Sequence, residues 1–342
     1  MQETVRLSLS DAETLVIEAL CASRVSRANA RSTAKALVAA EADGQSGHGL
    51  SRVPAYAMQA RAGKVDGHAI AKLELLAPSA LKIDAGFGFA YPAIDLAIAQ
   101  LEVLTTQHAL ACALIGRSHH FGQAGAHVER LAARGLIAIM LGNTPKAMAF
   151  AGGQKAMLGT NPIAFAAPLR DAATADAPLV IDLALSVAAR GKIVAAQKAG
   201  KPVPDSWAVN SAGEPTTDPS EALAGSLVPI GGNKGAALAL VVEIMTAALI
   251  GCAFGWEASS MFDDRGGPPN TSQIIIGFDP QRLSQGRFAA RMQDLLAVVH
   301  GQAGVRLPGT SRLTRRATAH RAGIAIPSSL HSEISALIHT TV

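Results

Sequence analysis

The sequence predicts an α/β protein whose two ends form an α-helical region. The chain has 342 residues, 49% of them hydrophobic and only 16% charged, so it carries enough apolar material for a large core. Helical spacing of apolar residues dominates up to residue 70. Beyond it, short aliphatic runs separated by Gly and Pro alternate with helical segments, an order typical of an α/β core. We therefore expect a helical region over 1–70 that packs with 310–342, and an α/β core over 71–309.

Capping and periodicity locate the helices of the terminal region. The tetrapeptide SDAE at 10–13 has the form of a capping box, and the Leu, Ile and Ala spacing after it is helical to about residue 22. Further helices are expected at 28–42, 51–61 and 328–339. The last of these has the length to pack back on the first helix.

The core is predicted from aliphatic runs bounded by turn residues. Strands are expected at 80–84, 111–115, 136–141, 162–166, 179–183 and 273–278, and helices at 91–108, 122–133, 234–250 and 282–300. The polar stretch 191–227, rich in Pro and Gly, predicts an extended excursion on the surface. The apolar run 236–255 is about twenty residues long, but Glu243 in its middle favours a buried helix over a membrane span.

Composition argues against several classes of protein. The net charge is only +4, the thirty Lys and Arg are scattered and aromatic residues make up 4%, so no dense basic stripe suits a nucleic acid. A mildly basic balance suits small anionic ligands. Three separate cysteines without a CxxC pair, Cys21, Cys112 and Cys252, favour reduced thiols and a cytoplasmic location. The first residues show no signal-peptide pattern.

Several familiar catalytic motifs are missing from the sequence. It contains no GxGxxG, the fingerprint of the Rossmann dinucleotide-binding fold, and no GxxxxGK[ST] phosphate loop. It also contains no HExxH zinc motif, and the serine in GQSGH at 44–48 lacks the second glycine of a nucleophile elbow. Hydrolase and NTPase functions are therefore not expected.

The segment Ser46-Gly47-His48-Gly49, with Arg52 close behind, has the composition of a ligand site. If a helix starts near residue 51, His48 lies at its first turn with Arg52 on the same side. Arg52 could hold an anionic substrate while His48 moves a proton. The alternative is an ordinary helix start, in which His48 makes one local hydrogen bond and Arg52 is solvated.

A second candidate is the histidine-rich turn at 116–122, which follows a predicted strand and opens a helix. Backbone N–H groups at such a helix start suit a phosphate. His119 and His120 lack the third ligand at helical spacing that a zinc site needs, so no metal is expected.

A third candidate is Asp182, because a carboxylate beside an apolar run must be paired when it is buried. We expect His48 as its partner, which would raise the pKa of the ring and suit a general acid. Three further segments have the composition of turns or anion loops: LGTNP at 158–162, GGNKG at 231–235 and RLPG at 306–309.

Taken in order, six motifs resemble those of the malate/L-lactate dehydrogenase family. They are GHGLSRVPAY at 47–56, RSHHFGQAG at 117–125, LGTNPIAFAAP at 158–168, LVIDLALS at 179–186, GGNKGAALAL at 231–240 and RLPG at 306–309. The resemblance spans nearly the whole chain. It implies a non-Rossmann mixed sheet with flanking helices, which agrees with the missing GxGxxG. The SHHF pattern and AFGWEASS at 253–260 are most similar to the Δ1-piperideine-2-carboxylate/Δ1-pyrroline-2-carboxylate reductases.

The resemblance implies a role for each motif. His48 would be the proton donor, Asp182 its supporting carboxylate, Arg52 the clamp on the substrate carboxylate, and Thr160 a second substrate contact. The residues implied around the dinucleotide are His119, His120, Phe121, Gly122, Gln123, Ala124, Asn233, Lys234, Gly235, Arg306, Leu307, Pro308 and Gly309. Relatives commonly have serine where this chain has Gly47. Either Ser46 reaches the histidine, or the relay consists of His48 and Asp182 alone.

The implied activity is that of an NAD(P)H-dependent reductase of cyclic ketimine 2-carboxylates, forming L-proline or L-pipecolate in hydroxyproline or lysine degradation. NADPH is the expected cofactor, with NADH as the alternative, and a cytoplasmic homodimer without a metal, nucleic acid or membrane partner is expected. One alternative is a dehydrogenase of an open-chain 2-hydroxy acid such as malate, lactate, sulfolactate or ureidoglycolate. Another is a ligand-binding protein that has lost catalysis.

Overall fold

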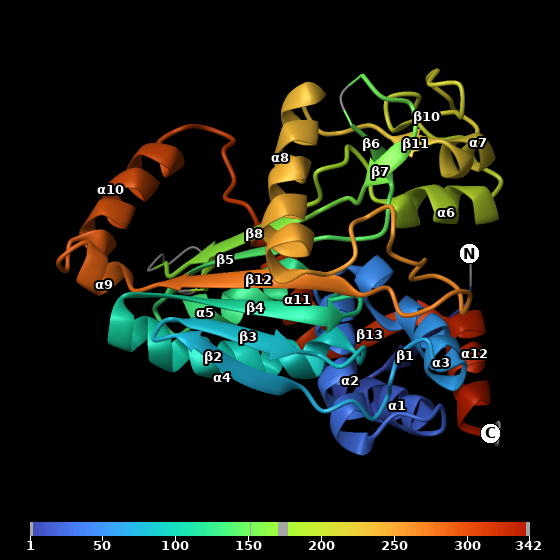
Figure 1. Cartoon of the computed structure of the whole chain (residues 1–342), viewed down its shortest axis with the longest axis horizontal. Coiled ribbons are helices and arrows are strands. Elements are labelled where there is room, and N and C mark those ends of the chain that lie inside the picture. Colours follow the sequence, from blue (N-terminus) through green and yellow to red (C-terminus); the bar gives the residue numbers. More distant parts are fainter. Residues whose placement is uncertain (1–2, 151, 170–176, 340–342) are drawn as a thin grey trace.

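The computed structural model describes residues 3–150, 152–169 and 177–339 (Figure 1). Its centre is a seven-stranded mixed sheet in the order β2-β3-β4-β12-β5-β8-β9. The bounds are β2 (Lys72–Ala77), β3 (Ala80–Asp84), β4 (Leu110–Ser118), β5 (Ile137–Gly142), β8 (Ile163–Ala167), β9 (Leu179–Leu183) and β12 (Thr271–Phe278). Only β3 and β4 pair in parallel, and the other neighbours are antiparallel. The predicted α/β class with a mixed sheet is confirmed.

Helices cover both faces of this sheet. On one face, α4 (Ala90–His108) and α5 (Ala124–Ala132) share a hydrophobic core with the strands. On the other stand α8 (Asn233–Glu243) and a π-helical turn, η4 (Ile244–Ala248) (Figure 1). Successive side chains of a strand point to opposite faces of the sheet, so the strands present apolar rows to the helices on both faces.

The two ends of the chain share another core. β1 (Thr4–Leu7) pairs antiparallel with β13 (Ile324–Pro327), a strand pair absent from the sequence-based prediction. Around it lie α1 (Leu9–Cys21), α2 (Arg27–Ala42), α3 (Val53–Arg61), α11 (Thr310–Ala322) and α12 (Ser328–His339). The capping box places the start of α1 too late, because the hydroxyl of Ser8 accepts the N–H of Asp11 and caps the helix. The division of the chain into two domains stays a prediction.

The stretch 191–227 is not the extended excursion predicted for it. It contains α6 (Arg190–Lys198), β10 (Ala208–Val209), α7 (Pro219–Ala224) and β11 (Ser226–Leu227). With β6 (Met148–Ala149) and β7 (Ala156–Leu158) these strands form a four-stranded sheet, β10-β11-β6-β7. Buried residues such as Ile193 and Val203 anchor it to the core beneath α8. Because they are too sparse to make a period, the prediction missed them.

Two of the predicted helices differ from those observed. The run 234–250 is α8 and η4. Ala239, Val242 and Glu243 are buried on the core as expected, but Leu238, Val241, Ile244 and Leu249 on the opposite face are exposed, so the predicted helix is buried on one face only. The run 282–300 is divided into α9 (Pro280–Leu283) and α10 (Phe288–His300), because Gln285 and Gly286 adopt positive φ angles between them. In the described ranges, no helix is long and apolar enough to cross a membrane.

Candidate functional site

The turn that carries His48 follows directly from the end of α2. Gly44, with φ of 76°, lets the chain leave the helix, and two 3₁₀ turns follow, η1 (Ser46–His48) and η2 (Leu50–Arg52). The carboxylate of Glu41 accepts the backbone N–H of Leu50 at 2.9 Å. A Cβ at Gly49 would overlap that carboxylate, so this position needs glycine. Turn and helix are thereby locked together.

Arg52 is held in place yet keeps donors for a ligand. Its Nε donates to the carbonyl oxygen of Gly47 at 2.7 Å, and its guanidinium lies 4.6 Å from the ring centre of Phe262. Among the described residues its two terminal nitrogens make no hydrogen bond. Two such nitrogens on one guanidinium can bind both oxygens of a carboxylate in a bidentate pair.

His48 belongs to a chain of polar side chains that leads into the core. Its Nδ1 lies 3.3 Å from Nε2 of His120, and the two rings are stacked with centroids 5.3 Å apart. Nδ1 of His120 lies 2.5 Å from the hydroxyl of Tyr56, which in turn lies 3.0 Å from the hydroxyl of Tyr91. His120, Tyr56 and Tyr91 are all buried. No local pattern predicts that these residues meet, because α3, α4 and the histidine-rich turn are distant along the chain.

The field around these rings is positive. Burial, and next the charge of Arg52, lower the pKa of His48 to about 4. Burial, Arg52 and Lys64 lower the pKa of His119 to about 3, and burial with Arg52 holds the pKa of His120 well below its ordinary value. The raised pKa expected for His48 is therefore wrong. Every charged group that shifts these three rings is a cation, which suits an anionic ligand.

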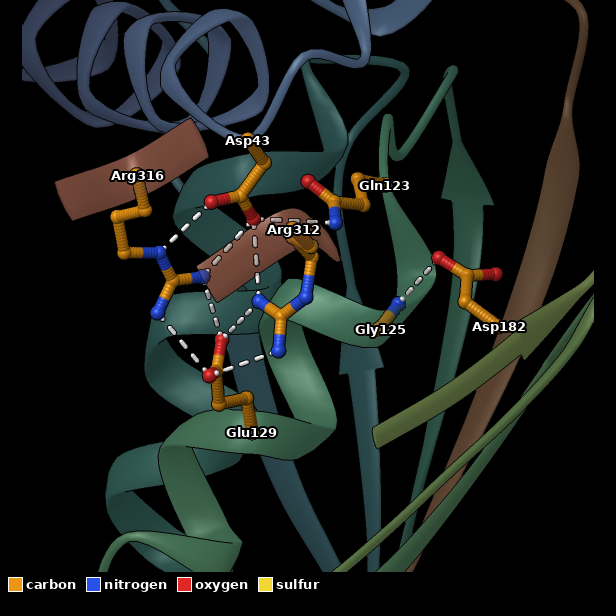
Figure 2. Close-up of polar contacts among 7 residues, drawn as sticks. All are labelled: Asp43, Gln123, Gly125, Glu129, Asp182, Arg312 and Arg316. Atoms are coloured by element: carbon orange, nitrogen blue, oxygen red, sulfur yellow. Dashed lines mark hydrogen bonds and ion pairs between the residues drawn. The ribbon is translucent and has the colours of Figure 1, made fainter. Parts of the chain in front are cut away.

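Asp182 lies beside the first turn of α5 (Figure 2). Its Oδ2 accepts the backbone N–H of Gly125 at 2.7 Å, one of the free donors of the first helical turn. Asp182 as a whole residue is exposed, but burial of its carboxyl group raises the pKa of that group. The hydrogen bond from the Gly125 N–H lowers this pKa by less. Across the described ranges no hydrogen bond joins Asp182 to His48, so the predicted pair is not made. Its supporting role stays a prediction.

Four charged residues, which no sequence motif singled out, connect the end of α2, just before the His48 turn, to α5, which follows the histidine-rich turn (Figure 2). We call them the arginine clamp: Arg312 and Arg316 on α11, Asp43 at the end of α2, and Glu129 on α5. Asp43 is fully buried, and it accepts from Arg312 at 3.1 Å and from Arg316 at 2.7 Å. The amide of Gln123 also donates to Asp43 at 3.2 Å. The clamp therefore fixes the chain just before the His48 turn and just after the histidine-rich turn.

The other predicted site residues have different surroundings. Thr160 donates its backbone N–H to the hydroxyl of Thr144 at 2.9 Å. Beside it, the amide of Asn161 donates to buried Glu243 at 2.7 Å, a contact that fixes this turn on α8. Ser46 is exposed, and its hydroxyl makes no hydrogen bond among the described residues. A Cβ at Gly47 would meet nothing within 4 Å, so a serine there would fit.

The segments predicted to surround a dinucleotide include polar groups that fit one. Two polar atoms, Nδ1 of His119 in the histidine-rich turn and Oε1 of Gln123 directly after it, are buried with no hydrogen-bond partner in the part of the chain that the structure describes. Gly309, at the end of the 306–309 loop, packs near the backbone of Val180 in β9, close to the start of α5. The first turn of α8 has no side-chain cap, and Lys234 there is exposed, which suits a phosphate.

The turn at 233–235 lies at the end of α8 that stands away from the central sheet (Figure 1). Assignment of all three segments to one cofactor therefore stays a prediction.

Known proteins resemble this chain over nearly its whole length. Residues 7–335 match the malate/L-lactate dehydrogenase family. A (2R)-3-sulfolactate dehydrogenase (NADP(+)) from Chromohalobacter salexigens is 49% identical over 90% of each chain, and a Δ1-pyrroline-2-carboxylate reductase from Ancylobacter novellus is 36% identical over 98% of each. The crystal structure of Δ1-piperideine-2-carboxylate reductase from Pseudomonas syringae pv. tomato matches with a TM-score of 0.91 and 32% identity, over 98% of this chain and 100% of that one. The chain therefore belongs to the malate/L-lactate dehydrogenase family of nicotinamide-dependent oxidoreductases.

Proposed function

We propose that this protein is an NADP-dependent dehydrogenase that interconverts an anionic 2-hydroxy acid and its 2-oxo acid, with (2R)-3-sulfolactate as the first substrate to test. The observation that carries the proposal is the setting of His48, where burial and then nearby cations lower the pKa of three histidines, and where the terminal nitrogens of Arg52 make no hydrogen bond to any described residue. A substrate with both a carboxylate and a sulfonate would match those cations. The 49% identity to a sulfolactate dehydrogenase supports the same substrate.

His48 has the protonation state that the oxidative direction requires. With a pKa of about 4, its ring is neutral near pH 7, and a neutral imidazole can accept the proton of the substrate hydroxyl. Arg52 holds the substrate carboxylate beside it and so fixes the distance between the hydroxyl and the ring. A nicotinamide cofactor would supply the hydride acceptor for C2, while the protein supplies orientation and the proton acceptor.

Substrate binding would also adjust His48 for the reverse reaction. Arg52 lowers the pKa of the ring in the free protein. A carboxylate on Arg52 screens that charge, so we expect the pKa of His48 to rise in the complex. The ring can then hold the proton that it returns to the substrate oxygen when the 2-oxo acid is reduced.

The second candidate is the reduction of cyclic ketimine 2-carboxylates with NADPH. It is supported by the 36% identity to a pyrroline-2-carboxylate reductase and by the TM-score of 0.91 to a piperideine-2-carboxylate reductase. Arg52 would hold the single carboxylate and His48 would face the ring nitrogen. In this reaction His48 would be the proton donor to the nitrogen, and Thr160 would make the second substrate contact.

Initial rates with the purified protein separate the two candidates. NADPH is mixed with 3-sulfopyruvate, oxaloacetate, pyruvate, Δ1-pyrroline-2-carboxylate or Δ1-piperideine-2-carboxylate, and each reaction is repeated with NADH. We expect the highest kcat/KM with 3-sulfopyruvate and NADPH. A preference for either cyclic imine would contradict the proposal and favour the second candidate. Binding of NADPH without its oxidation by any of the five would contradict both. The homodimer and the cytoplasmic location stay predictions.

A further inference from the structure

Phe262 is an exposed aromatic residue whose ring lies against the guanidinium of Arg52. The guanidinium carbon lies over the ring, 4.6 Å from its centre, and 43% of Phe262 is exposed. Such a contact is an electrostatic attraction between the cation and the π face of the ring. Arg52 is therefore held at two points, by this ring and by the hydrogen bond that its Nε donates to the carbonyl oxygen of Gly47.

The loop that carries Phe262, residues 261–265, is fixed although it forms no helix or strand. The side chain of Lys64, just beyond α3, is only 1% exposed. Its Nζ donates to the carbonyl oxygens of Asp263 at 3.0 Å and of Arg265 at 2.6 Å. A lysine is rarely buried unless its donors are satisfied, so these contacts indicate a loop with one defined conformation.

A second contact fixes the loop on the other side of Phe262. The amide nitrogen of Gln59 donates to the carbonyl oxygen of Met261 at 3.1 Å, and the amide oxygen of Gln59 lies 2.7 Å from Nε2 of His119. Gln59, Met261 and His119 are all buried. The backbone that presents the ring of Phe262 is thus anchored both before and after this residue.

The carboxylate next to Phe262 in the sequence is turned to other partners. Oδ1 of Asp263 accepts the backbone N–H of Arg265 at 3.0 Å and lies 3.5 Å from Nζ of Lys64. In the described ranges no carboxylate forms an ion pair with Arg52. A carboxylate partner would occupy the terminal nitrogens of Arg52 and compete with an anionic substrate, whereas the aromatic ring leaves those nitrogens without a hydrogen bond.

We propose that Phe262 is a positioning residue, which holds the guanidinium of Arg52 in the orientation that binds the substrate carboxylate. The inference rests on the proposed function in taking Arg52 as the group that binds the substrate anion. An arginine side chain loses rotamer freedom when it binds a ligand, and one that is already ordered loses less, so the substrate binds more tightly. The effect belongs to binding rather than to proton transfer at His48, and we expect it in KM more than in kcat.

The order of the Arg52 side chain can be measured without any substrate. ¹⁵N relaxation gives the order parameter of its Nε–H group, and the signal is assigned by its loss in Arg52→Met. We expect about 0.85, the value of a rigid backbone, in the wild-type protein and in Phe262→Tyr, and less than about 0.6 in Phe262→Leu. A mobile Arg52 in the wild-type protein, or the same order parameter in all three proteins, would overturn the proposal.

The same variants test the consequence for substrate affinity. Phe262→Leu keeps an apolar side chain but removes the π face, so we expect KM for the 2-oxo acid to rise about 3- to 10-fold and kcat to change less than about 2-fold. Phe262→Tyr keeps the π face and should keep the wild-type KM. The control is Phe288→Leu, the same substitution at a partly exposed residue of α10, which should change neither constant. Equal effects of Phe262→Leu and Phe262→Tyr, or a fall in kcat with KM unchanged, would overturn the proposal.

A double variant distinguishes an effect through Arg52 from a separate structural effect. If Phe262 acts through Arg52, adding Phe262→Leu to Arg52→Met should raise KM no further, because the contact is already lost. Fully additive increases in KM would overturn the proposal. Lack of turnover with every substrate in the panel would contradict the proposed function, and the order parameters would still decide the role of Phe262.

Discussion

His48 is chemically unusual because it combines a stacked, hydrogen-bonded ring with a nearby cation. The variant His48→Asn removes the half-buried imidazole whose pKa Arg52 lowers. We expect kcat to fall about 10²- to 10⁴-fold, the usual value of a general base, while the Kd for NADPH stays the same. Stopped-flow rates and NADPH fluorescence titration check this, with His68→Asn, which changes an exposed histidine, as control. Unchanged turnover would refute the role of His48.

Arg52 acts on both substrate affinity and proton transfer. In Arg52→Met the charge-assisted hydrogen bonds to the substrate carboxylate are lost, so we expect KM to rise about 10- to 100-fold, with Arg52→Lys intermediate. Removing the cation should also raise the pKa of His48, although burial, the larger cause, keeps it below 6.5. The acid limb of kcat/KM for hydroxy acid oxidation should therefore move to higher pH in Arg52→Met. A limb that moves to lower pH would contradict this.

The sequence predicted the His48 and Arg52 motif better than it predicted the side chains that contact His48. The spacing of His48 and Arg52 was enough to suggest an anion site, because both residues lie within one local turn. The partner of His48 was not predictable, since His120 and Tyr56 reach it only through the tertiary fold. Asp182 could be recognised as a buried-carboxylate candidate, but only the fold shows that it bonds the first turn of α5.

The arginine clamp holds three elements together, and its loss should be costly. Arg312 has a side chain only 8% exposed and bonds both Asp43 and Glu129. In Arg312→Met two buried carboxylates lose a partner, so we expect the free energy of unfolding to fall by about 3 kcal/mol. The control is Arg291→Met on α10, whose ion pair with Asp294 is 78% and 62% exposed, and we expect it to change stability by less than about 0.5 kcal/mol. Urea unfolding compares them, and equal effects would contradict the clamp.

Elements with a regular pattern were predicted well. The bounds expected for 80–84 and 179–183 coincide with β3 and β9, because each is a short, mainly aliphatic segment. By contrast, β6, β7, β10 and β11 are two or three residues long and have no period to detect. The strand pair β1 and β13 joins opposite ends of the chain, a pairing that local patterns do not specify.

Across the whole molecule, neutral buried histidines make stability depend on pH. Burial lowers the pKa of His119 to about 3 and that of His127 to about 4, from an ordinary 6.5, and it holds that of His120 well below 6.5. The unfolded chain thus binds more protons below pH 6.5, so the stability is complete above that pH and is lost as the pH falls toward the folded pKa values. Each of these three histidines contributes a slope of about 1.4 kcal/mol per pH unit.

Urea unfolding at several pH values between 7 and 5 measures this slope. Burial raises the pKa of Glu129, but the guanidinium groups of Arg312 and Arg316 outweigh burial and hold this pKa below its ordinary value. In His127→Gln we expect the slope to decrease by about 1 kcal/mol per pH unit on average over this window, and in the exposed-site control His68→Gln to stay the same. A stability that does not change over this window would contradict the neutral state of these rings.

The arrangement of the whole sheet was predictable only as a class. Alternating strands and helices indicated an α/β core, and the family motifs implied a mixed sheet. The strand order, with β12 inserted between β4 and β5, depends on contacts between segments more than a hundred residues apart. For the same reason the four members of the arginine clamp, from three separate parts of the chain, could not be connected beforehand.

The distance between the substrate hydroxyl oxygen and Nε2 of His48 tests the central claim most directly. A crystal structure of the protein with NADP⁺ and (2R)-3-sulfolactate would provide it. The account predicts a hydrogen-bond distance of about 2.6–3.2 Å, with an anionic group of the substrate on the terminal nitrogens of Arg52. A substrate whose hydroxyl faces another side chain, with Arg52 unengaged, would contradict it.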